Sequence, residues 1–352
     1  MKVYRDIFND IVSLENLFLA WDSFKSGKQK RKDVQLFEWQ LEDNIFKLHR
    51  DLKYYKYEHG DYTSFYIQDP KQRHIHKASV RDRVLHHAIF TILNPIFEST
   101  FISNSFSCRV DKGTHKGINV LDKMIRQVSS NSFKQCFVLK CDVKKFFDTI
   151  DHRILLKIIS MRVKDEDAIW ILEQIIGSLS SESTTIFKKK GLPIGNLTSQ
   201  LFANIYLNEL DQFIKHELRI KNYIRYTDDF VIVSDNELYL KNLINSIRSF
   251  LSDELGLELH PKKTNISKSH RGVDFLGYIV LPHYRLLRTK TKQRIFRKLK
   301  ERVRDYNNGT ITKQTLNQSF QSYLGVMSHT NAYNLEQELK NQFWFDYSSH
   351  GT

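Results

Sequence analysis

The chain has 352 residues, of which 41% are hydrophobic and 27% are charged. These values exclude an intrinsically disordered chain and predict a full core divided into roughly two or three subdomains. Lys and Arg number 54 against 40 Asp and Glu, which leaves a net charge of +14. This excess favours a polyanionic partner. The 16 Tyr and 24 Phe favour nucleic acid over a membrane surface, because aromatic rings can stack on bases.

The cysteines and the N-terminus indicate the compartment. Cys108, Cys136 and Cys141 form no CxxC motif, and no His/Cys cluster has zinc spacing, so we expect a reducing compartment without disulfides. The N-terminus is charged and amphipathic, unlike a signal peptide, and no apolar run approaches membrane-spanning length. We therefore expect a soluble cytoplasmic protein without a membrane partner.

The first sixty residues predict two amphipathic helices, over residues 3–24 and 34–52. A strongly basic connector, residues 25–32, joins them. The helices could simply pack on the body of the protein, and the connector could contact phosphate or remain solvated.

A hairpin with two cations is expected over residues 62–76. It carries Lys71 and Arg73 ahead of a helix that Ser79 would cap and that would extend through Leu93. Such a hairpin could close over the triphosphate of a nucleotide, or the two residues could be ordinary surface cations.

An acidic residue ends the next buried strand, residues 137–143. Asp142 lies where catalytic acids commonly follow apolar strands, although it could instead cap the following turn. Asp151 is expected to cap a helix. Upstream, Arg109 in an extended segment could pair with a phosphate or with Asp111.

A polar motif opens a long helix in the middle of the chain. Residues 180–190 predict an exposed hairpin, and residues 191–200 lead into a helix that ends near Leu218. Thr198 and Gln200 place polar side chains at the start of this helix, where free N–H groups favour phosphate or base edges.

Two adjacent acids interrupt the apolar segment 224–233. Asp228 and Asp229 fall at the turn between two short strands. Neighbouring carboxylates repel each other and remain ionised beside a cation, so the turn is either a solvated one or part of a metal site. Together with Asp142, they would supply the hard oxygen ligands that two Mg²⁺ ions need for in-line phosphoryl transfer.

The last third of the chain is rich in Lys and Arg. Residues 236–254 predict a helix, a strand surrounds Ile266, and residues 273–280 predict one strand with Gly277 inside it as a bulge. Beyond residue 286, three helices form a basic unit that could grip a duplex through its phosphates. We expect them at residues 287–305, 312–325 and 331–343.

In this order the motifs resemble those of a reverse transcriptase over residues 60–335. Tyr226-Thr227-Asp228-Asp229 matches the Tyr-x-Asp-Asp box, and the strand ending at Asp142 is similar to the palm motif. The resemblance implies an α+β, right-hand polymerase fold with fingers, an antiparallel palm sheet and an α-helical thumb. The implied domains are an N-terminal helical extension (1–60), fingers and palm (61–285) and a basic thumb (286–352).

The same resemblance implies an RNA-directed DNA polymerase with two Mg²⁺ ions, for which Mn²⁺ can substitute. Its partners would be an RNA template, a DNA or RNA primer and dNTPs. The implied catalytic acids are Asp142, Asp228 and Asp229, joined as metal ligands by the carbonyl of Val143. The implied nucleotide-binding residues are Lys71, Arg73, Phe147, Gln200 and either Lys262 or Lys263. The implied primer grip is Phe275, Leu276, Gly277 and Tyr278. Phe147 occupies the steric-gate position, which disfavours an RNA-synthesising polymerase.

The segment from Ile194 to Gln200 narrows the resemblance. Ile194 and Gln200 replace the Gln and Pro typical of group II intron enzymes and retrons, and this variant is similar to the enzymes of diversity-generating retroelements. That group implies adenine-directed mutagenesis of a template-repeat RNA and a small basic accessory protein. The alternatives are an antiphage-defence or retron-like enzyme that copies its own structured non-coding RNA, and a catalytically inactive RNA-binding protein.

Overall fold

The structure is a computed structural model that describes residues 2–68, 71–178 and 189–348. The chain divides into two compact units. The first comprises residues 1–111, 141–230 and 243–264, and the second comprises residues 112–140, 231–242 and 265–352. None of the helices in the described ranges combines the length and apolar character needed to cross a membrane.

The first unit begins with four short helices: α1 (Ile7–Val12), α2 (Leu14–Lys25), α3 (Lys32–Trp39) and α4 (Leu41–Lys53). The prediction of two continuous helices was therefore wrong. Ser13 has an extended backbone, and its hydroxyl accepts a hydrogen bond from the Asn16 N–H, so it ends α1 and caps α2. Gln40, with φ −123° and ψ 46°, leaves the helical region between α3 and α4 without a side-chain cap. Neither break contains the Gly or Pro that usually signals one.

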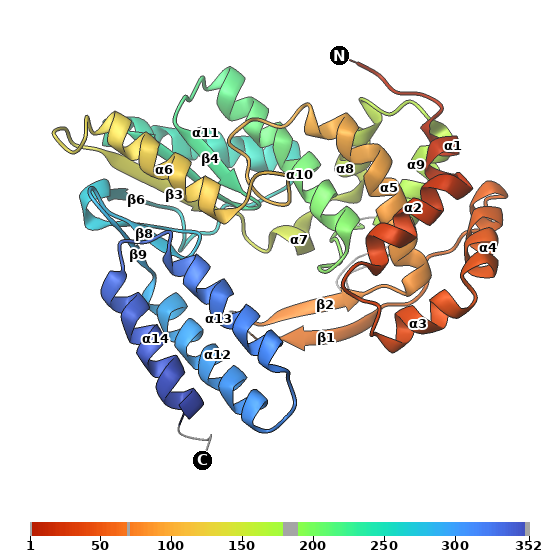
Figure 1. The fold of residues 1–352 in the computed structure, drawn as a ribbon. Coiled ribbons are helices and arrows are strands. Elements are labelled where there is room, and N and C mark those ends of the chain that lie inside the picture. The colour runs from red at the N-terminus through yellow and green to blue at the C-terminus, as the bar shows by residue number, and fades with distance from the viewer. Residues whose placement is uncertain (1, 69–70, 179–188, 349–352) are drawn as a thin grey trace. The chain divides into compact units, whose positions relative to one another are not determined.

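The predicted hairpin and the capped helix after it are both present (Figure 1). The hairpin consists of β1 (Thr63–Ile67) and β2 (Arg73–Lys77), paired antiparallel. Ser79 caps α5 (Val80–Glu98) by accepting from the Asp82 N–H. The helix passes the expected end at Leu93 and includes Pro95. Burial of Ile96 and Phe97, which are 5% and 3% exposed, fixes this last turn despite the lost backbone hydrogen bond.

Four further helical elements complete the body of the first unit, namely α7 (Phe146–Thr149), α8 (His152–Ser160), α9 (Glu166–Ile176) and α10 (Leu197–Gln212). Asp151 caps α8 as expected, through the N–H groups of Arg153 and Ile154. The almost wholly buried α10 packs against α5 and continues as a π-helical turn, Phe213–Glu217. The hairpin expected at 180–190 lies almost entirely outside the described residues.

A four-stranded sheet has the order β4-β5-β3-β6. Its strands are β3 (Phe137–Asp142), β4 (Tyr223–Tyr226), β5 (Asp229–Ser234) and β6 (Asn265–Lys268), and α11 (Glu237–Leu255) follows β5. β3 pairs antiparallel with β6. Most residues of β3 and β5 are buried, as their continuous apolar sequences predict.

The second unit contains α6 (Thr114–Val128) and a small antiparallel sheet of β7 (Val273–Phe275), β8 (Tyr278–Val280) and β9 (Arg285–Leu287). The prediction of a single strand with a bulge at Gly277 was therefore wrong. Leu276 and Gly277 both have positive φ and form the two-residue turn of a hairpin.

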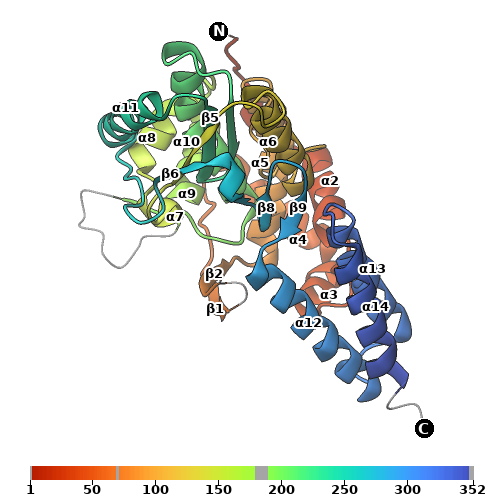
Figure 2. The same ribbon diagram turned by 90° about the vertical axis from the view of Figure 1, so that its left-hand side faces the viewer.

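Three helices end the second unit and lie side by side in Figures 1 and 2. They are α12 (Thr289–Asn307), α13 (Lys313–Met327) and α14 (Tyr333–Ser348). Ile295, Leu299 and Val303 form the buried stripe of α12 at a spacing of four residues. The basic side chains of α12 lie between these buried positions, so the helix can pack through one face and remain strongly charged on the others.

Candidate active site

Asp142 ends β3 in a buried position with 7% of its surface exposed. Its backbone carbonyl accepts a hydrogen bond from the His260 N–H at 2.7 Å. Both of its carboxylate oxygens lie 2.7 Å from the Nζ of Lys263. The neighbouring Lys262 is exposed, so the structure distinguishes two lysines that the sequence could not separate.

The second acidic strand end lies beside the first. Asp228 occupies the turn between β4 and β5, and its carbonyl accepts from the Val143 N–H at 3.3 Å. Burial, reinforced by the negative charges of Asp142 and Asp229, raises the pKa of the Asp228 carboxyl to about 6, and the Lys263 ammonium opposes this shift. Asp142 and Asp229, the other two acids singled out in the sequence, therefore act electrostatically on Asp228.

The donor set suits a hard divalent cation, because carboxylates and a backbone carbonyl are the oxygen ligands that Mg²⁺ prefers. Among the described residues, no group of three His, Cys, Asp or Glu side chains is already arranged to hold a metal ion. Mg²⁺ is usually bound by one or two carboxylates together with substrate phosphates. Asp142 and Asp228 supply two such carboxylates, and a cation between them would relieve the repulsion of their negative charges.

Phe147 lies on the short helix α7, five positions after Asp142. Its ring is half-buried and packs edge-on against Phe146, with a centroid distance of 5.4 Å. Its backbone carbonyl accepts from the Leu192 N–H at 2.8 Å, which ties α7 to the loop before α10. In this loop Gly191 has a φ of +101°, a conformation that L side chains rarely adopt.

A basic cavity of about 340 Å³ adjoins the start of α10. Gln200 and Asn196 line it from α10 and its N-cap, and the Asn196 Oδ1 is buried with no hydrogen-bond partner among the described residues. Four cations also line it: Lys28, Arg31, Lys77 and Arg83. Burial, and then the charges of Arg83 and Arg31, lower the pKa of the Lys28 ammonium, so the positive charges here are crowded.

Gln200 was expected at a site, but the four cations and Asn196 were missed by sequence reasoning. The basic connector, residues 25–32, was the available signal, but its contact with the hairpin depends on the tertiary fold. Lys71 and Arg73, which the sequence favoured, are exposed on the hairpin and are not among the cavity-lining residues. Arg109 pairs with Glu98 at 2.7 Å, not with Asp111, and 6% of its side chain is exposed.

The proposed primer grip lies in the second unit. Phe275 and Tyr278 pair across the β7–β8 hairpin and are buried, whereas Leu276 and Gly277 at its tip are half-buried. The Arg288 N–H donates to the Gly277 carbonyl at 3.0 Å, and the Tyr278 hydroxyl donates to the Val326 carbonyl at 3.2 Å. The hairpin is thereby fixed to α12 and α13.

The sequence of this chain is similar to those of known proteins. Residues 68–280 match the family described as reverse transcriptase (RNA-dependent DNA polymerase). The chain is 26% identical to Protein YkfC of Escherichia coli (strain K12), over 61% of this chain and 63% of that protein. It is 22% identical to the group II intron-encoded protein LtrA of Lactococcus lactis subsp. cremoris, over 86% of this chain and 58% of that protein.

The chain therefore spans less than two thirds of the length of these relatives. A solved structure of apo telomerase from Candida tropicalis gives a TM-score of 0.48 at 14% identity, covering 70% of this chain and 60% of that one. The family match covers more than half of the 352 residues. The chain thus belongs to the reverse transcriptase family, and its mixed helix-and-sheet structure is a right-hand polymerase fold.

Proposed function

We propose that this protein is an RNA-directed DNA polymerase that adds deoxynucleotides to a primer 3′ end. The observation that carries the proposal is the meeting of Asp142 and Asp228, from two strand ends, with Lys263 against the Asp142 carboxylate. In the proposed domain organisation, residues 1–60 form an N-terminal extension, residues 61–285 fingers and palm, and residues 286–352 the thumb.

Asp142, Asp228 and the Val143 carbonyl would hold two Mg²⁺ ions, or Mn²⁺ in their place, with Asp229 as the third acid. When bound, these ions would lower the pKa of the primer hydroxyl and neutralise phosphate charge. Lys263 supplies a positive charge beside Asp142 that can pair with the leaving pyrophosphate. Lys71 and Arg73, exposed on the hairpin, would contact the triphosphate.

The basic cavity beside Gln200 supports contact with a single-stranded RNA template. Lys28 and Arg31, which line the cavity, would contact the RNA phosphates. Phe65, which is 44% exposed, adds an aromatic face on which a base can stack. In the second unit, α12 would grip the duplex through its phosphates.

Primer extension tests the proposal directly. Purified protein with an RNA template, a DNA primer, dNTPs and Mg²⁺ is expected to extend the primer, and EDTA is expected to stop the reaction. The absence of extension, with the candidate RNA and accessory protein present, would support the RNA-binding alternative instead.

Replacing Phe147 with alanine is expected to increase ribonucleotide use. The ring would exclude the ribose 2′-hydroxyl, and contacts of this kind contribute about 1–3 kcal/mol to selectivity, so the preference for dNTPs should fall by roughly 10-fold or more. The measurement is the ratio of kcat/KM for a dNTP and its rNTP. Phe133→Ala is the matched control, because that ring is 92% exposed. An unchanged ratio in Phe147→Ala would remove the steric-gate assignment.

Within this activity, we propose the diversity-generating role, in which adenines of a template-repeat RNA are copied with errors and a small basic accessory protein assists. The sequence from Ile194 to Gln200 supports it. The Ile194 carbonyl accepts from the His76 N–H of β2 at 3.0 Å, and Gln200 is exposed at the cavity, so the variant positions adjoin the proposed template site.

Sequencing of the cDNA distinguishes this role from antiphage defence. Substitutions are expected to concentrate opposite template adenines in reactions that include the accessory protein. Errors spread evenly over the four template bases would favour the enzyme that copies its own non-coding RNA.

A further inference from the structure

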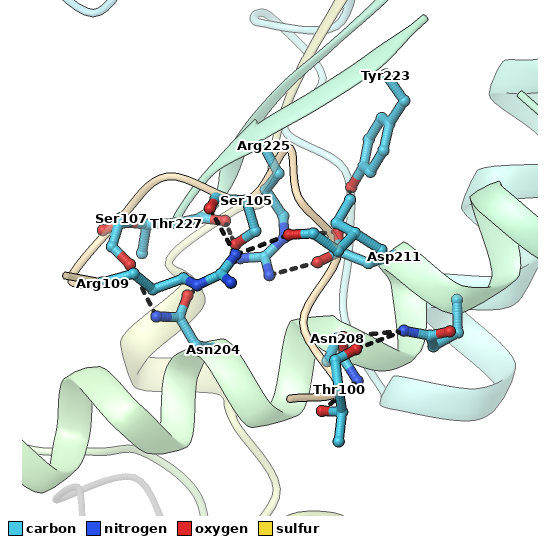
Figure 3. A network of polar contacts seen from close by, with 12 residues as sticks. Thr100, Ser105, Ser107, Arg109, Asn204, Asn208, Asp211, Tyr223, Arg225 and Thr227 are labelled. Carbon is cyan, nitrogen blue, oxygen red and sulfur yellow. Dashed lines mark hydrogen bonds and ion pairs between the residues drawn. The ribbon is translucent and has the colours of Figure 1, made fainter. Parts of the chain in front are cut away.

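Arg225 is fully buried and forms a bidentate ion pair with Asp211 (Figure 3). Its Nε and Nη2 donate to the two Asp211 oxygens at 2.8 and 2.6 Å. The Tyr223 hydroxyl donates to the same carboxylate at 2.7 Å. Removing two charges from water is costly, and replacing a buried pair with apolar residues is often neutral or stabilising. Stability alone therefore does not account for this pair.

The remaining nitrogen of Arg225 reaches the turn that carries the catalytic acids. Its Nη1 donates to the Thr227 carbonyl at 3.1 Å. Thr227 has a φ of +54°, which is a genuine outlier and a strained conformation for a β-branched residue. Such a conformation persists only where the surroundings fix it, and Asp228 is the next residue.

A second contact holds the side chain of Thr227. Its hydroxyl donates to the Ser107 Oγ at 2.6 Å. Asn204 on α10 links the residues that make these two contacts, Ser107 and Arg225. Its Nδ2 donates to the Ser107 carbonyl at 2.9 Å, and its Oδ1 accepts from Arg225 Nη1 at 3.4 Å. Asn204 and Asp211 are seven residues apart and therefore lie on one face of α10.

The backbone of residues 104–106 places Ser107. The Arg225 N–H donates to the Asn104 carbonyl and the Phe106 N–H donates to the Arg225 carbonyl, each at 3.0 Å. Arg109 fixes the same segment by donating to the carbonyls of Ile102 and Ser105. The turn is thus held from α10, from β4 and from this segment.

We propose that Arg225, Asp211, Asn204, Ser107 and Thr227 form a turn support, a set of positioning residues that holds Thr227 in its left-handed conformation and thereby orients Asp228 for metal binding. None of them needs to touch substrate. The inference rests on the proposed polymerase function, because the acids it orients are those of the proposed metal site.

The Thr227–Ser107 hydrogen bond gives the sharpest test. Thr227→Val and Ser107→Ala each remove it, and Thr227→Ser retains it. One such bond contributes about 0.5–1.5 kcal/mol, so each of the first two variants is expected to raise the Mg²⁺ concentration for half-maximal extension by roughly 2- to 12-fold. The double variant should match Ser107→Ala, because that substitution already removes the acceptor of the Thr227 hydroxyl. Thr227→Ser should restore the wild-type midpoint.

Ser105→Ala is the matched control, since that buried hydroxyl has no hydrogen-bond partner among the described residues. The second readout is the rise in melting temperature that Mg²⁺ produces without primer or nucleotide, which should shrink in Thr227→Val and Ser107→Ala only. Unchanged Mg²⁺ midpoints together with lower melting temperatures would overturn the inference and leave a purely structural role. If the wild type extends no primer, the polymerase proposal fails, while the Mg²⁺-induced melting shift still decides the inference.

Discussion

Asp228→Asn is expected to reduce primer extension by roughly 10³-fold, without loss of stability. The amide keeps the shape of the side chain but removes the negative charge that would hold the metal. A loss of about 4 kcal/mol of charge stabilisation in the transition state corresponds to this factor. Because the pKa of Asp228 is raised from 3.8 to about 6, its ionised form destabilises the metal-free fold above pH 6. The variant should therefore melt at the same temperature as the wild type, or higher, at pH 7.

Single-turnover extension on an RNA template and a melting curve are the two measurements. Asp253→Asn, at an exposed position of α11, is the matched control and should behave as the wild type. Equal extension by the Asp228→Asn protein would contradict the two-metal assignment. A large fall in melting temperature would show that the carboxylate acts mainly in the fold.

Asp211→Asn is expected to lower the free energy of unfolding by about 3–5 kcal/mol. The substitution leaves the Arg225 guanidinium charged, fully buried and without its counter-charge, and breaking a buried pair on one side has this cost. The measurement is urea denaturation at pH 7, followed by circular dichroism. The wild-type denaturation curve gives the free energy of unfolding of the wild type. If that value is smaller than the expected loss, the variant should not fold at 25 °C.

Glu209→Gln is the control for this prediction. Glu209 lies two residues away on α10, and burial raises the pKa of its carboxyl, so its charge does not support the fold. The substitution should change the free energy of unfolding by no more than about 0.5 kcal/mol. A loss below 1 kcal/mol in Asp211→Asn would contradict the conclusion that its ion pair with Arg225 is desolvated.

The sequence predicted the acidic strand ends well because their signals are local. A buried apolar strand that stops at Asp142, and a pair of acids between two apolar segments, need no tertiary information. The caps at Ser79 and Asp151 are short-range hydrogen bonds within one helix turn, and they too were confirmed. The family match over residues 68–280 confirms the fold class that these motifs indicated.

Other features depended on contacts between distant segments. Nothing in the sequence near Asp211 marks it as a partner of Arg225, because a lone acid on a helix ordinarily faces solvent. The choice between Lys262 and Lys263 depends on which side chain the turn after His260 directs toward Asp142. The hairpin at Gly277 was missed because Leu276, unlike Asn or Asp, is a rare residue at positive φ.

The extended segment beside β4 has a consequence for solubility. β4 is the last strand of its sheet, and an edge strand with open N–H and carbonyl groups can recruit a strand from another molecule. Here Asn104 and Phe106 bond to both backbone groups of Arg225, in the middle of that edge. The segment to which we assign the support of the Asp228 turn therefore also closes this edge to strand addition, which is expected to protect the sheet against aggregation.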